Sequence, residues 1–130
     1  MTANDHHKKA DHNEQFIDRM FGDYVANPSP FLDWVVTAIF YVAVHKVDEY
    51  LASVSNGQHP IEHRDRRRFV QTLPDLRVVS SEYRWLEDRS RESRYQLSAF
   101  NPTNVRSWRT NKLGKIKTHI DRRIQELDRS

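Results

Sequence analysis

The chain has 130 residues, of which 37% are hydrophobic and 30% charged, and this length fits one domain with a modest apolar core. It contains no cysteine, which excludes disulfides, thiolate zinc sites and thiol nucleophiles. The apolar run from Trp34 to Val44 is far shorter than the roughly 20 residues that a membrane-spanning helix needs. With a formal net charge of +3 and no leader-like N-terminus, the chain is predicted to be soluble and cytoplasmic, without a membrane partner.

Helical periodicity runs through nearly the whole chain, and proline-marked breaks divide it into segments. A first helix is predicted over about residues 8–24, while residues 1–7 are predicted to be disordered. The segment Asn27-Pro28-Ser29-Pro30 ends this helix, because a proline disfavours helical backbone in the residue before it. A second helix is predicted over about residues 31–54, and Asn56 or Gly57 is expected to cap it in a left-handed conformation.

Three further helices are predicted in the second half of the chain. The third covers about residues 61–72 and the fourth about residues 75–97. The last runs over about residues 105–128, capped by Thr103 or Asn104. Five helices with short connections predict an all-α fold, an antiparallel up-and-down bundle in a single domain. The buried apolar positions are expected to be Phe16, Met20, Tyr24, Leu76, Val79, Tyr83, Leu86, Leu113, Ile116, Ile120, Ile124 and Leu127, with Trp34 and Trp85 in the core or an interface.

The second helix carries a polar stripe through its apolar body. Tyr41, His45 and Asp48 are four and three residues apart, so they fall on one face of the helix. Because buried polar groups destabilise a fold unless they find partners, other side chains are expected to face this stripe. His45 also has a purely structural interpretation, in which Asp48 or a backbone carbonyl satisfies it within the core or an interface.

Arginines gather in two clusters in the middle of the chain. Planar guanidinium groups bind phosphate and carboxylate through paired hydrogen bonds, so the clusters favour an anionic ligand such as a nucleotide or RNA. The alternative is that these long side chains only solvate helix faces. The first cluster comprises Arg64, Arg66, Arg67 and Arg68, and the second comprises Arg84, Arg89, Arg91 and Arg94.

Three segments in order resemble the HEPN domain family, the higher-eukaryote and prokaryote nucleotide-binding domains. They are Trp34–Tyr41 with His45, then His59-Pro60 with His63 and Arg67, and then Ser90–Tyr95, within about residues 33–97. The resemblance implies a bundle of four or five helices, commonly paired into a homodimer with a cleft along the interface. It implies that the chain is similar to metal-independent endoribonucleases, often toxins or antiviral defence effectors, or to members that bind nucleotides or act as inactive partners of nucleotidyltransferases.

The chain departs from this family at the cleavage residues. Ribonuclease members carry an arginine followed four to six residues later by a histidine, and no such pair occurs here. His119 is the one histidine after the Arg-rich central segments, and it lies ten residues beyond Arg109. Any cleavage site would therefore have to be assembled from other residues.

Substitute residues are present on three of the predicted helices. Histidine suits proton transfer near neutral pH and arginine stabilises negative charge, so the candidate catalytic residues are His63, Arg94 and His45. Each candidate has a structural alternative, in which the tyrosines pack in the core and Arg94 joins an ion-pair network. The candidate ligand-binding residues are Tyr41, Arg67, Ser90, Arg91 and Tyr95.

Two functions from different classes remain open. In the first, the chain is a HEPN-like protein that binds nucleotide or RNA, with metal-independent endoribonuclease activity in a defence or toxin–antitoxin setting as the catalytic form of this hypothesis. In the second, it is a non-catalytic helical interaction module that partners a nucleotidyltransferase or another protein. A homodimer is expected. No metal or cofactor is expected, because His6, His7 and His12 belong to the predicted flexible tail.

Overall fold

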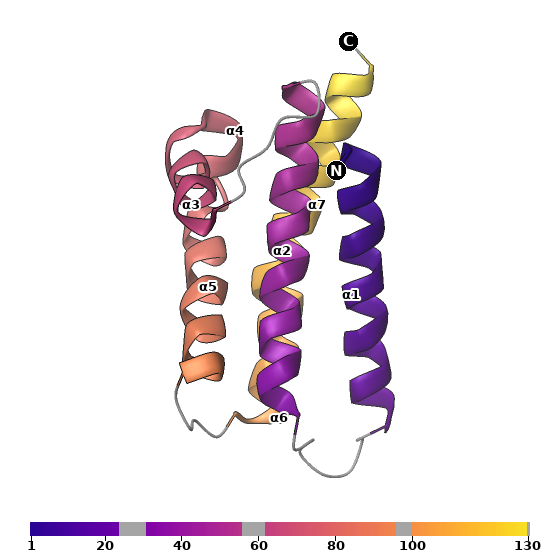
Figure 1. Cartoon of the computed structure of the whole chain (residues 1–130), viewed down its shortest axis with the longest axis vertical. Coiled ribbons are helices and arrows are strands. Elements are labelled where there is room, and N and C mark those ends of the chain that lie inside the picture. Colours follow the sequence, from indigo (N-terminus) through magenta and orange to yellow (C-terminus); the bar gives the residue numbers. More distant parts are fainter. Residues whose placement is uncertain (24–30, 56–61, 96–99, 130) are drawn as a thin grey trace.

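The computed structural model describes residues 1–23, 31–55, 62–95 and 100–129, and within these ranges the chain is helical with no strand. The long helices alternate in direction, with α2 in the middle, α1 and α5 on either side and α7 behind (Figure 1). This confirms the predicted all-α up-and-down bundle. The elements are α1 (Ala3–Asp23), α2 (Leu32–Val54), α3 (His63–Thr72), α4 (Pro74–Arg77), α5 (Ser80–Tyr95), α6 (Pro102–Trp108), η1 (Arg109–Leu113) and α7 (Gly114–Asp128).

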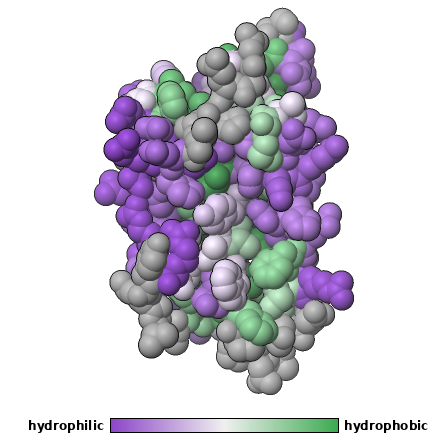
Figure 2. All heavy atoms as spheres, in the orientation of Figure 1, coloured by the Kyte–Doolittle hydropathy of each residue, from purple (hydrophilic) through white to green (hydrophobic). Residues whose placement is uncertain are grey.

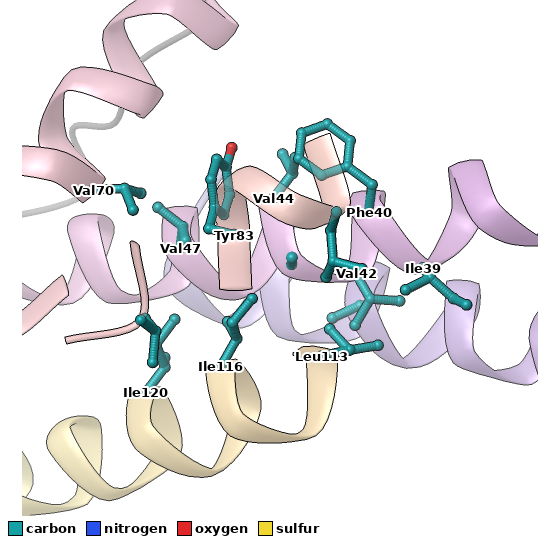
Figure 3. Close-up of a cluster of buried hydrophobic side chains, with 14 of the residues drawn as sticks. Ile39, Phe40, Val42, Val44, Val47, Val70, Tyr83, Leu113, Ile116 and Ile120 are labelled. Carbon is teal, nitrogen blue, oxygen red and sulfur yellow. The ribbon is translucent and has the colours of Figure 1, made fainter. Parts of the chain in front are cut away.

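The central position of α2 follows from its sequence, which is apolar on nearly every side. A helix of this kind must be covered all round, and burying each large aliphatic side chain contributes about 1.5–3 kcal/mol. Figure 3 shows part of the resulting core, to which α2 supplies more side chains than any other helix. Its labelled members are Ile39, Phe40, Val42, Val44 and Val47 of α2, Val70 of α3, Tyr83 of α5, Leu113 of η1, and Ile116 and Ile120 of α7. No helix in the described ranges is long and apolar enough to cross a membrane.

The predicted fourth helix is two helices, because a turn at Val78 and Val79 separates α4 from α5. Its predicted apolar face is nevertheless confirmed, since Leu76, Val79, Tyr83 and Leu86 are all buried. The last predicted helix is continuous from Pro102 to Asp128, with one π-helical turn, η1, near its middle. Its apolar stripe is buried as far as Ile120, whereas Leu127 at the end is 40% exposed.

The N-terminal residues were predicted to be disordered, and the structure corrects this. The helix α1 begins at Ala3, because Thr2 and Asp5 form reciprocal side-chain to backbone hydrogen bonds that satisfy its first amide groups. Hydrogen bonding to Thr2 also holds the pKa of Asp5 below its usual value. His6 is then buried against α2, so tertiary contacts add to the local cap.

Two other expectations change in the structure. Asn101, rather than Thr103 or Asn104, caps the last helical stretch, and its side chain accepts hydrogen bonds from the backbone amides of both. The expected caps at Asn56 and Gly57 lie outside the described residues. Trp34 is 60% exposed and so does not belong to the core of this chain.

The first helix turns a different face to the core from the one predicted. Ala10 and Ile17 are buried, whereas Phe16 is 40% exposed and Met20 is only partly covered. Tyr24, the third expected member of that face, lies outside the described residues. The exposed apolar residues of α1 lie beside Trp34 and so help to form an open groove.

Candidate functional site

The polar stripe of α2 is met by side chains from α1 and α3. The Tyr41 hydroxyl lies 3.4 Å from Nε2 of His63, and Nδ1 of His45 lies 3.0 Å from Nδ1 of His6. Asp48 accepts two hydrogen bonds from Arg66, at 2.8 and 2.9 Å. The prediction that other side chains face the stripe is therefore confirmed. Asp48, which was considered as a partner for His45, is instead held by Arg66.

Asp48, Arg66, His63 and Tyr41 form one hydrogen-bonded chain, called here the Asp48–Tyr41 relay. Asp48 and Arg66 are both buried, and the Arg66 guanidinium donates to Nδ1 of His63 at 3.0 Å. An arginine has only donors, so Nδ1 of His63 accepts and the neutral ring carries its proton on Nε2. That proton points to the Tyr41 oxygen. The relay thus begins at a buried carboxylate and ends at a phenol hydroxyl whose own proton is available to another acceptor.

His63 and His45 are both held in the neutral form. Burial lowers the pKa of His63, and the positive charge of Arg66 lowers it further. Burial lowers the pKa of His45 to about 4, and the neighbouring His6 contributes in the same direction. Asp48 acts against this shift, whereas Arg66 and Lys9 add to it. At neutral pH both imidazoles therefore offer one donor and one acceptor nitrogen and no charge.

An open groove with a volume of about 590 Å³ runs between α1 and α2, beside the end of the relay. This α1–α2 groove is mainly apolar, and its most exposed ring is the indole of Trp34. Figure 2 shows it as pale and green spheres in the lower middle of the molecule, between hydrophilic edges. The lining includes Lys9, Asn13 and Phe16 of α1, Phe31 at the start of α2, and Trp34, Tyr41 and His45 of α2.

The structure brings some of the predicted site residues together around Glu87 of α5. Glu87 is buried and accepts a hydrogen bond of 2.6 Å from Arg67. Arg91 lies 4.0 Å from the same carboxylate and remains exposed. Arg67 therefore links α3 to α5, and Glu87 pairs with its charge inside the protein. The guanidinium of Arg91 is exposed to solvent.

The remaining predicted residues lie at different depths in α5. Arg94 is exposed, and its positive charge contributes to the lowered pKa of His63. Ser90 is fully buried, so it does not reach a ligand from this position. Ser93, one turn further along, bonds to Thr37 of the groove at 2.7 Å. The side chain of Tyr95 and all of His59 lie outside the described part of the chain.

Several residues of the site were missed as site residues by sequence reasoning, among them Trp34 and Phe16, which were expected in the core or an interface. Lys9 and Asn13 were not considered because the groove-lining side of α1 depends on how that helix is rotated. Phe31 was placed only at the start of a helix, and His6 was assigned to a flexible tail. Arg66 was counted only within an arginine cluster, although its spacing of three residues from His63 is a usable signal for a histidine–arginine contact on a helix.

Within the described residues, no three His, Asp or Glu side chains gather as ligands for a metal ion. Comparison with protein-family models, with curated proteins and with solved structures finds no significant match for the chain.

Proposed function

We propose that the chain binds a nucleotide, either free or as a unit of RNA, in the α1–α2 groove. The observation that carries this proposal is the indole of Trp34, which is 60% exposed in a groove large enough for a nucleobase. An exposed indole is unfavourable in water, and stacking of a base on an aromatic side chain contributes about 1–3 kcal/mol per base. Lys9 at the rim supplies a positive charge for a phosphate.

The relay supplies the polar contact of the proposed site. Because Nε2–H of His63 points to the Tyr41 oxygen, the hydroxyl proton of Tyr41 is left to donate to a ligand. A carbonyl of a base or a phosphate oxygen accepts such a bond. The buried Asp48–Arg66 pair holds this arrangement in place, which favours ligands that present an acceptor next to a flat ring.

Binding is better supported than cleavage by this geometry. A general base needs a nitrogen lone pair that faces the substrate, and in the relay the free lone pair of His63 is already directed at Arg66. His45 shares its Nδ1 with His6. The metal-independent endoribonuclease activity in a defence or toxin–antitoxin setting, with His63, Arg94 and His45 as catalytic residues, stays a prediction that follows from the HEPN resemblance.

Titration calorimetry with adenosine 5′-monophosphate tests the binding proposal. Trp34→Ala is expected to weaken binding by about 5- to 150-fold, which corresponds to the stacking energy of one base. Trp34→Phe is the matched control, because a smaller ring still stacks and most of the affinity should return. Wild-type affinity in Trp34→Ala, or no binding of adenosine 5′-monophosphate to the wild type, would show that the groove is not a nucleotide site.

Incubation of labelled RNA with the protein in the presence of EDTA separates binding from cleavage. The proposal expects intact RNA for the wild type and for His63→Ala. If the wild type cuts RNA and His63→Ala does not, the groove belongs to a ribonuclease and the non-catalytic reading is wrong.

A second candidate function is that of a protein interaction module. The observation in its favour is the apolar lining shared by Phe16, Phe31 and Trp34, each at least 40% exposed. The expected homodimer or a nucleotidyltransferase partner would cover these residues. Sedimentation of the wild type and of Phe31→Glu tests the homodimer, because a charge in the interface should convert a dimer to monomers. A wild-type monomer at high concentration contradicts this candidate in its homodimeric form.

A further inference from the structure

A second groove lies where α5 meets η1 and α7. It has a volume of about 600 Å³ and shares no lining residue with the α1–α2 groove. One wall is α7, which presents Lys115, Thr118 and Arg122 at steps of three and four residues. The other wall is the beginning of α5 and the turn before it, with Glu82 and Val78. The second groove therefore combines positive charge on one side with an apolar edge on the other.

Arg122 is held in place without losing its charge. Its guanidinium donates to Nδ1 of His119 at 3.1 Å, and Nε2 of His119 donates to the backbone carbonyl of Asp75. An arginine only donates, so Nδ1 of His119 accepts and the ring in this arrangement is neutral. A neutral histidine thus orients the guanidinium and leaves its positive charge to an outside partner.

The carboxylates near Arg122 are engaged with other cations. Asp121 pairs with the buried Lys46, and Glu126 pairs with Arg123. Within the described ranges, neither of the two exposed cations of the groove wall pairs with a carboxylate. Glu82 is the one acidic side chain among the described residues that line the groove. The lining therefore keeps an excess of positive charge.

The spacing of the two cations indicates the kind of ligand. Lys115 and Arg122 are seven residues apart, which is two turns and about 10 Å along a helix that rises 1.5 Å per residue. Two acidic residues seven positions apart on another helix have the same separation and also share one face. In an extended peptide, side chains about 10 Å apart are three residues apart and point to opposite faces. A helix therefore matches both cations, whereas an extended segment does not.

Val78 and Gly114 favour a protein as the partner over a nucleic acid. Val78 is 67% exposed, the largest exposed fraction among the large apolar side chains that the structure describes. A Cβ added to Gly114 would meet only the Arg109 carbonyl, at 3.7 Å, so the fold leaves the groove open at this point. An apolar side chain of a partner would cover Val78 and fill this space. A chain of phosphates would gain nothing from either and would be repelled by Glu82.

We infer that the second groove binds an acidic amphipathic helix of a partner protein. Two carboxylates seven residues apart on that helix pair with Lys115 and Arg122, and an apolar side chain between them lies on Val78. The second groove shares no residue with the proposed nucleotide site, so this interaction does not depend on the nucleotide.

An NMR titration of the full chain with a designed peptide tests the inference. The probe is an alanine-based helix of about 16 residues, with two glutamates seven residues apart and one leucine between them on the same face. It should cause saturable shifts of the backbone amide resonances of Thr110, Thr118 and Arg122, and none at Trp34. A control peptide with glutamine in place of both glutamates should bind at least fivefold more weakly, because both ion pairs are lost. Equal binding of the two peptides overturns the inference.

Substitutions in the protein test the charge and the shape of the groove separately. Arg122→Gln should weaken binding of the glutamate peptide at least twofold, whereas Lys8→Gln, at an exposed cation of α1, is the matched control and should keep the wild-type affinity. Gly114→Leu changes no charge and fills the open space, so it should also weaken binding. Leucine is a better helix former than glycine, so this variant should remain folded, which thermal unfolding checks. Wild-type affinity in Arg122→Gln or in folded Gly114→Leu overturns the inference.

Other occupants of the groove would give different results. If a second copy of the chain covered it, the same resonances would shift with protein concentration before any peptide is added. If a nucleic acid occupied it, oligoadenylate RNA would shift these resonances and displace the peptide. Either result overturns the inference in favour of that occupant.

Discussion

Two of the grooves formed by the described residues are nearly equal in size and different in character. The α1–α2 groove has a volume of about 590 Å³, and a second groove of about 600 Å³ lies where α5 meets η1 and α7. Aromatic rings line the first groove, whereas most of the residues that line the second are polar or charged, such as Thr110, Asn111 and Lys115. The two grooves therefore cannot be distinguished by volume. The exposed indole of Trp34 and the relay beside it identify the α1–α2 groove as the candidate site.

A histidine and an arginine three residues later stand beside each groove. Arg66 donates to His63 at 3.0 Å, and Arg122 lies 3.1 Å from Nδ1 of His119. The second nitrogen of His119 is taken by the backbone carbonyl of Asp75, at 2.5 Å. At the second groove the histidine of this pair is therefore held by a backbone carbonyl. At the first groove the pair connects the buried Asp48 carboxylate to the Tyr41 hydroxyl in the groove wall.

The largest difference between the two regions is expected in stability. Arg66→Met should destabilise the fold by about 3–5 kcal/mol, because it leaves the Asp48 carboxylate buried without its cation. Arg123→Met breaks the 2.6 Å pair with Asp75 near the second groove, where both groups are partly exposed, and should have a much smaller effect. Urea denaturation at pH 7 measures both. Similar losses in the two variants would contradict the special role of the buried pair.

The stability of the fold is expected to depend on pH because of His45, which lines the α1–α2 groove. Its pKa is about 4 in the folded chain and about 6.5 when unfolded, so between these values the unfolded state binds more protons. The contribution of His45 to stability is therefore complete above pH 6.5 and declines as the pH falls, by roughly 3 kcal/mol at pH 4. Urea denaturation across this range should show a shallower decline for His45→Gln than for the wild type. Parallel curves would contradict the prediction.

The fold could be predicted from the sequence to the extent that periodicity alone decides it. The apolar stripe from Leu76 to Leu86 and the apolar body of α2 must each be buried along their length, so their buried positions could be predicted. The faces of α1 could not be chosen in this way. Phe16 and Ile17 are adjacent apolar residues on different sides, and only packing against α2 decides that Ile17 is the buried one.

The polar stripe of α2 was predictable from spacing, whereas the partners of its residues were not. Tyr41, His45 and Asp48 share a face by spacing alone, and this holds. Their partners depend on tertiary structure: His6 comes from a segment with little apolar content, and Arg66 is one of four arginines in a five-residue stretch. Composition alone does not predict which of these arginines is buried. Arg66 is buried because Asp48 lies opposite it, where α2 contacts α3.

A smaller effect is expected at the end of the relay. Tyr41→Phe removes the hydroxyl that the proposed nucleotide would meet and keeps the ring in place. A typical hydrogen bond contributes about 1 kcal/mol, so the affinity for adenosine 5′-monophosphate should fall roughly fivefold. Thr118→Val, which removes a hydroxyl from the second groove, should leave the affinity at the wild-type value. Equal effects of the two substitutions, measured by calorimetry, would mean that the two grooves cannot be distinguished by their ligand.

The smallest effect is expected for a substitution in the second groove that should change the stability of the fold and leave ligand affinity unchanged. Gly114 is the first residue of α7 and lines this groove, and a Cβ added to it would meet only the Arg109 carbonyl, at 3.7 Å. Glycine in a helix costs about 0.5–1 kcal/mol relative to alanine, so Gly114→Ala should stabilise the chain by this amount, measured as a higher urea midpoint. Affinity for adenosine 5′-monophosphate should not change, because the added methyl lies in the second groove. If affinity falls while stability rises, the second groove takes part in binding, and its polar lining is then functional as well.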